Sequence, residues 1–147
     1  MAFLKFIKKW SPQRVFLADA SGALITTSIL AFVLAPLSDY LNLPEHIPFT
    51  LAGIAAFFFL YSLSTALIKP RNWPVFMKII ALANFLYCPI TWFFLFREGA
   101  GVYAFIYFAG ETALIAAIAL TEWKYAIRFK SRKFDVRNSI AQEKPAE

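Results

Sequence analysis

Four long apolar segments constrain this chain more than any other feature of its sequence. They cover about residues 16–37, 47–68, 74–96 and 102–123, and each is 22 or 23 residues long. As a helix, each segment would measure about 33 Å, enough to cross a hydrocarbon core of about 30 Å. Lipid offers backbone amides no partner, so spanning segments must be helical. The sequence therefore predicts an all-α, polytopic membrane protein built as a four-helix transmembrane bundle.

The composition agrees with lipid as the surrounding solvent. Of the 147 residues, 60% are hydrophobic and only 16% are charged. The single cysteine, Cys88, excludes an internal disulfide, and the single histidine, His46, excludes a multi-histidine metal cluster. The sequence shows no nucleophile–base pair, metal-ligand set or phosphate-binding loop. We therefore expect no metal and no cofactor, and an enzyme is the least favoured class of function.

The basic residues predict the orientation of the spans. Lys and Arg gather before the first span, around the second connection and after the last span, while Arg97 is the only basic residue expected at the opposite ends. The positive-inside rule then places both termini in the cytoplasm. We divide the chain into a basic amphipathic arm (1–14), a transmembrane domain (15–123) and a basic cytoplasmic tail (124–147). The end of the tail is expected to be disordered.

Both terminal regions mix basic and aromatic residues in a way that suits a lipid surface. In the arm, apolar and basic residues separate onto two faces of a short helix. Such a helix lies in the membrane plane, where its lysines reach anionic headgroups. Nucleic-acid binding would need more than short basic runs beside a span, so the predicted partner is the bilayer. The expected headgroup anchors are Lys5, Lys8, Lys9, Trp10, Trp73, Trp123, Arg128 and Lys130.

Polar residues within the spans are expected to face other helices, because lipid tails are as apolar as the helices themselves. Counted from the cytoplasmic ends at about 1.5 Å per residue, they fall at two depths. The tier near mid-membrane comprises Asn84, Tyr87 and Glu111. The tier near the cytoplasmic surface comprises Asp19, Ser64 and Glu122. One stripe of the first helix carries Asp19, Gly22, Ala23 and Thr26.

Glu111 is the deepest acid, and an ionised carboxylate at the centre of a span costs about 2.5–3.5 kcal/mol on insertion scales. As a functional group it would relay protons or contact a cationic substrate. As a structural group it would bond to Asn84 or Tyr87 and fix the order of the helices. The structural interpretation is favoured, because no basic residue is expected at the depth of Glu111. Asp19, nearer the surface, is expected to be solvated or paired with Arg14.

Several short motifs occur in a defined order along the chain. They are Leu17-Ala18-Asp19 with Gly22-Ala23-Leu24, then "KPRNW" at 69–73, "ALANFLYC" at 81–88 and finally Glu111. This arrangement resembles a group of uncharacterised small bacterial membrane proteins with four predicted helices. The resemblance covers most of the chain except the tail. It implies a location in the bacterial inner membrane and brings no activity with it.

Two classes of function remain after these exclusions. The favoured one is a non-enzymatic accessory or interaction subunit of the inner membrane, in which inward polar groups set the helix packing. The alternative is a small transporter or channel-like subunit that moves protons or cations by means of Glu111, with Asn84 and Tyr87. A subunit of four helices is expected to form a homo-oligomer or to join a larger membrane complex.

Overall fold

The computed structural model describes residues 10–142, with side chains described as far as Arg128. The arm residues Lys5, Lys8 and Lys9 therefore lie outside the described residues, as do the side chain of Lys130 and the last five residues of the tail, 143–147. Within residues 10–142 all regular elements are helices.

The chain forms four long helices. In order, the elements are α2 (Pro12–Ile29), the π-helical turn η1 (Leu30–Leu34), the short α3 (Ser38–Leu41), α4 (His46–Ile68), α5 (Trp73–Glu98) and α6 (Val102–Gln142). Within the described residues, four helical stretches are long and apolar enough to cross a membrane: Pro12–Leu34, His46–Ile68, Trp73–Glu98 and Val102–Arg128. The predicted fold class, a four-helix transmembrane bundle, is confirmed.

Proline and positive-φ residues mark the helix ends. Pro12 opens α2 four residues before the predicted start of the span, in a first turn where its missing amide hydrogen costs nothing. At the end of the first span the helix widens into the π-helical turn η1, in which the Ala35 amide donates to the Leu30 carbonyl five residues back, at 3.0 Å. Pro36 follows directly, and its ring would crowd the carbonyl of a regular preceding turn. α5 stops at Gly99, which has a φ of +64°.

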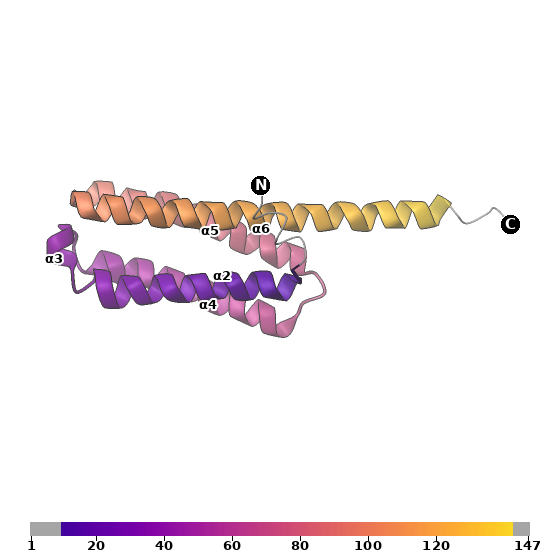
Figure 1. Cartoon of the computed structure of the whole chain (residues 1–147), viewed down its shortest axis with the longest axis horizontal. Helices are drawn as coiled ribbons and strands as arrows, with labels where there is room; N and C mark the ends of the chain where they lie inside the picture. Colours follow the sequence, from indigo (N-terminus) through magenta and orange to yellow (C-terminus); the bar gives the residue numbers. More distant parts are fainter. Residues whose placement is uncertain (1–9, 143–147) are drawn as a thin grey trace.

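The four long helices pack as two pairs, which Figure 1 shows as two layers. α2 runs along α4, and α5 runs along α6, whereas α4 and α5 touch over a smaller area. The pairs are tied at the end where α3 lies. There the Gly101 amide donates to the Leu41 carbonyl at 2.7 Å, and the Asn42 side chain donates to the Gly99 carbonyl at 3.0 Å. A Cβ at Gly101 would lie 2.9 Å from the Leu41 oxygen, so this close approach requires glycine.

The two ends of the bundle differ in charge. One end of the bundle contains the start of α2 and the connection between α4 and α5, and α6 extends beyond this end (Figure 1). It carries Arg14, Lys69, Arg71, Lys78, Lys124 and Arg128, and we call it the basic end. The other end, with α3 and the connection between α5 and α6, is the loop end. Both ends of the described chain thus lie on the side of the basic end.

The outer surface of the bundle is apolar. Phe32 is 79% exposed, Phe96 is 69% exposed and Ile106 is 66% exposed, and many other large apolar side chains share their orientation. A soluble monomer rarely exposes contiguous apolar surface on this scale, whereas lipid tails cover it at no cost. Small and medium side chains such as Ala52, Ala81 and Ala104 fill the interfaces between helices.

α6 continues beyond the membrane-spanning region. The sequence analysis ended the last span at Trp123 and expected a separate tail, but α6 runs unbroken to Gln142. No proline or glycine interrupts residues 124–142, which include several Lys, Arg and Ala residues of high helix propensity. Figure 1 shows this part of α6 projecting past the other helices on the side of the basic end.

Candidate functional site

Each of the four long helices contributes one polar side chain to a buried cluster in the half of the bundle nearer the basic end. The members are Asp19 from α2, Ser62 from α4, Asn84 from α5 and Glu122 from α6, and we call them the four-helix polar cluster. Glu122 is 1% exposed and Asp19 is 7% exposed, so both carboxyls lie inside the protein.

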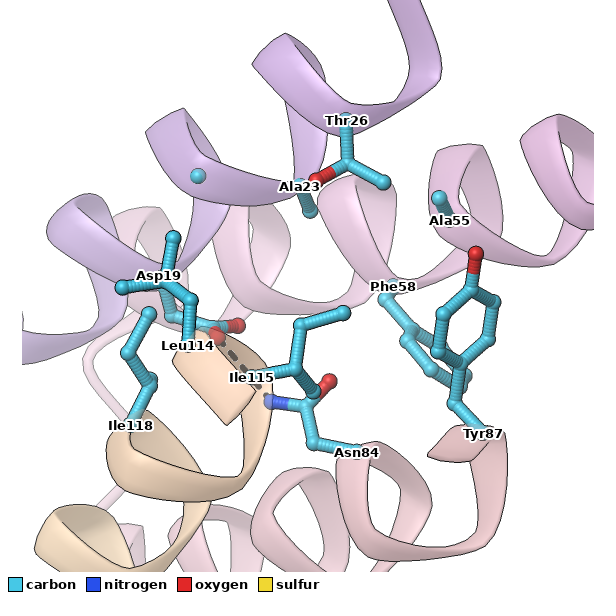
Figure 2. A pocket seen from close by; sticks show the side chains of 11 residues that line it. Asp19, Ala23, Thr26, Ala55, Phe58, Asn84, Tyr87, Leu114, Ile115 and Ile118 are labelled. Carbon is cyan, nitrogen blue, oxygen red and sulfur yellow. Dashed lines mark hydrogen bonds between the residues drawn. The ribbon is translucent and has the colours of Figure 1, made fainter. Parts of the chain in front are cut away.

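Asp19 is the acceptor at the centre of this cluster. The Ser62 hydroxyl donates to its Oδ2 at 2.5 Å, and the Asn84 amide donates to its Oδ1 at 3.1 Å. Figure 2 shows the second bond as a dashed line between α5 and α2. The Ser62 bond lies within the α2–α4 pair, whereas the Asn84 bond joins α2 to α5 and so connects the two helix pairs.

Glu122 lies beside Asp19 without a bonding partner of its own. Its carboxyl is close enough to interact with Asp19 and with Asn84. Nevertheless, neither of its oxygens accepts a hydrogen bond from a described residue, although both are buried. No salt bridge within the part of the chain with described side chains reaches either acid. Two acids therefore meet inside the bundle with no basic partner among the described side chains.

A cavity of about 60 Å³ adjoins the cluster, between the two helix pairs. It is lined by Asp19, Gly22, Ala23, Thr26, Ala55, Phe58, Asn84, Tyr87, Leu114, Ile115 and Ile118 (Figure 2). A Cβ placed on Gly22 would meet no atom within 4 Å, so the missing side chain at this position contributes to the open space. The stripe predicted on the first helix lines this cavity in full.

Tyr87 brings a second polar group to the cavity. The side chain is 2% exposed, and its hydroxyl makes no hydrogen bond within the described part of the structure. Its ring packs edge-on against Phe58, with 6.2 Å between the ring centroids. A buried hydroxyl without a partner forgoes about 1–3 kcal/mol unless water or a ligand supplies one.

Glu111 lies further from the basic end than the cavity does. Both of its oxygens are buried and accept no hydrogen bond from a described residue. Its carboxyl interacts electrostatically with Tyr87 and Tyr107. Glu111 and Glu122 are separated along α6 by eleven residues, about 16 Å of helix axis. The cavity residues of α6, Leu114, Ile115 and Ile118, fall between them, so the cavity lies between the levels of the two acids.

The structure differs from the sequence analysis in the grouping of these residues. Asn84 bonds to Asp19 rather than to Glu111, and Asp19 is buried instead of solvated or paired with Arg14. The reason is depth: because α2 begins at Pro12, Asp19 lies two turns inside the helix and reaches the level of Asn84. Tyr87 does lie near Glu111, as expected.

Ser64 is the second difference, because it is exposed on the outer surface while Ser62 is buried in the cluster. The sequence predicted Ser64 in the polar tier near the cytoplasmic surface, facing other helices. In the structure Ser64 faces outward. α4 is apolar on nearly every side, so its sequence does not indicate which side of the helix is buried.

The predicted headgroup anchors with described side chains all lie at the basic end: Trp10, Trp73, Trp123 and Arg128. The Tyr125 hydroxyl donates to the Trp10 carbonyl at 2.7 Å, and the Tyr125 ring lies 5.6 Å from that of Trp73. The Lys78 ammonium lies 5.8 Å from the centre of the Trp123 ring. Aromatic and basic side chains thus form a band of the kind found at membrane interfaces.

The described residues contain no group of three or more His, Cys, Asp or Glu side chains arranged to hold a metal ion. No protein-family model matches the chain, and neither the curated proteins nor the solved structures gave a match.

Proposed function

We propose that this protein is an integral membrane subunit that moves protons, or exchanges protons for another cation, by means of the Asp19–Glu122 pair. The observation that carries the proposal is the meeting of two buried carboxyls, from α2 and α6, without a basic partner and beside a cavity. Ionisable groups inside a membrane are costly, and they commonly mark proton or ion pathways.

The chemistry of the pair supports proton binding. Two carboxylates in contact inside a bundle repel each other, and such pairs hold one proton between them. Asp19 already accepts hydrogen bonds from Ser62 and Asn84, which stabilise its ionised form. Glu122 accepts no hydrogen bond from a described residue, so a proton on Glu122 that is donated to Asp19 would join the two acids in a hydrogen bond. Gain and loss of this proton is the step that we assign to the cluster.

The cavity offers a continuation of the path. A water molecule needs about 10–15 Å³ of such space, so a cavity of about 60 Å³ has room for a few. Water there would reach from Asp19 to the unpartnered hydroxyl of Tyr87, which lies beside Glu111. We therefore place Glu111 next in the relay, in the role considered for it from the sequence.

We place the basic end in the cytoplasm of a bacterium, with the bundle in the inner membrane. The positive-inside rule and the band of aromatic and basic residues support this orientation. We also propose that the bundle assembles into a homo-oligomer or joins a larger membrane complex through its apolar outer surface.

The proposal is tested by proton flux into proteoliposomes that contain the purified full chain, with an internal pH dye and an imposed membrane potential. We expect flux above that of protein-free liposomes, and at least about a tenfold loss in Glu122→Gln, because a glutamine cannot carry a proton. Glu45→Gln is the matched control, since Glu45 is exposed next to α4 and should leave the flux unchanged. Equal flux in wild type and Glu122→Gln would refute the proposal.

A second candidate function is the accessory or interaction subunit that the sequence favoured. The observation in its favour is the extension of α6, which runs to Gln142 and projects past the other helices on the side of the basic end (Figure 1). Its sequence contains Lys130, Arg132, Lys133 and Arg137, and a projecting basic helix suits an acidic partner.

A further inference from the structure

The cavity beside the four-helix polar cluster combines a small volume, acidic surroundings and largely apolar walls. We propose that it binds one small organic ammonium ion, of the size of methylammonium. This inference deepens the proposed function. It rests on that function only in one respect, the exchange of this ion with the proton of the cluster. Binding itself is argued from the cavity alone.

The volume limits the ligand to a few atoms. An apolar cavity of about 150 Å³ accommodates benzene, which has six non-hydrogen atoms. In proportion, about 60 Å³ accommodates two or three such atoms.

The charges around the cavity select a cation. Asp19 lines the cavity, Glu122 lies behind it, and Glu111 interacts with Tyr87 at the other side. No basic side chain is among the lining residues. An anion would therefore meet acids on both sides with nothing to offset the repulsion, whereas a monovalent cation would be attracted.

The lining favours an ammonium group over a bare metal ion. An ammonium ion needs only a few acceptors, and the cavity offers the Asp19 carboxyl and the Tyr87 hydroxyl, which has no partner and is 2% exposed. Figure 2 shows the amide oxygen of Asn84 turned away from Asp19, which makes it a third acceptor. Hard metal ions take a nearly complete shell of oxygen ligands, and apart from Asp19, Asn84, Tyr87 and the Thr26 hydroxyl the side chains of the lining supply carbon instead.

The apolar walls suit the carbon atoms of the ligand. Ile115, Ile118 and Leu114 form the side contributed by α6. The rings of Phe58 and Tyr87 offer aromatic surface, and cations bind favourably over aromatic rings. An alkylammonium ion thus matches both the polar and the apolar parts of the lining.

Two glycine variants provide the test. Gly22 lines the cavity, and a Cβ placed on it would meet no atom within 4 Å. The Gly22→Val variant therefore fills part of the cavity, and its Cβ displaces no neighbouring residue. Gly53→Val is the matched control: Gly53 is exposed on α4, its Cβ also meets nothing within 4 Å, and it does not line the cavity. Both variants carry the same change in helix propensity.

The measurement is equilibrium binding of radiolabelled methylammonium to the full chain in lipid nanodiscs. We expect saturable binding by wild type and Gly53→Val, and at least about tenfold weaker binding by Gly22→Val and by Asp19→Asn, which lose the space and the charge respectively. Tyr87→Phe should weaken binding by several-fold. Lowering the pH should also weaken it, because protons compete for Asp19 and Glu122.

Absence of saturable binding by wild type, or equal binding by wild type and Gly22→Val, would overturn this inference. The proton-flux measurement separates it from the proposed function. Flux that depends on Glu122 without methylammonium binding would leave the proposed function standing and remove the amine site. Methylammonium binding that depends on Gly22 and Asp19, without proton flux, would retain the site and remove the proton pathway.

Discussion

At the scale of single residues, the hydrogen bonds to Asp19 determine how an acid is accommodated inside this bundle. Ser62 and Asn84 supply the donors, and Glu122 approaches from the remaining helix. Every long helix therefore contributes to one local arrangement, in which the Asn84–Asp19 bond and the approach of Glu122 connect the two helix pairs.

Ser62→Ala tests this arrangement. The variant removes a donor to a buried carboxyl, and hydrogen bonds to charged groups contribute about 1.5–3 kcal/mol. We expect a loss of stability of that size, measured by denaturant unfolding in detergent micelles. Ser64→Ala is the matched control, because Ser64 is exposed two residues further along α4, and its effect should stay within about 0.5 kcal/mol. A larger loss for Ser64→Ala than for Ser62→Ala would mean that the buried face of α4 is misplaced.

These two serines also show what could be predicted from the sequence. The length and hydropathy of the segments are properties of the whole stretch, so the spans could be located to within a few residues. The stripe on α2 could be found because Asp19 marks its inward side. The buried face of α4 could not be predicted, because a helix that is apolar on all sides gives no difference in hydropathy between its faces. Ser62 and Ser64 have the same side chain and differ only in the side of the helix on which they lie.

At the scale of elements, the two helix pairs are held together differently at different depths. Near the loop end, the backbone contact between Gly101 and Leu41 joins them. Further toward the basic end, the four-helix polar cluster does so, and the cavity lies between these two contacts. Polar contacts are needed here because apolar surfaces of helices gain nothing by leaving lipid for each other.

α6 carries the prediction at this scale. If the protein is an accessory subunit, the part of α6 that projects past the other helices should bind its partner. Truncation after residue 128 should then release a partner that copurifies stoichiometrically in mild detergent, without lowering the unfolding temperature of the bundle. Repeated isolation of the full chain alone, with or without a cross-linker, would count against the accessory role.

At the scale of the whole molecule, an apolar exterior surrounds an interior that contains three acids: Asp19, Glu111 and Glu122. All three lie in membrane-spanning helices, and none has an ion-pair partner within residues 10–128. A bundle whose only task was to remain inserted would gain stability from apolar residues at these positions. These three buried acids are the feature on which the proposed binding of protons or cations rests.

The central claim is that Asp19 and Glu122 hold one proton between them inside the membrane. Infrared spectroscopy of the full chain in lipid, at neutral pH, measures this directly through the carbonyl band of protonated carboxyl groups. We expect the band in wild type and in Glu45→Gln, and a loss of intensity equivalent to one carboxyl in Glu122→Gln. A band of the same intensity in wild type and Glu122→Gln would contradict the account.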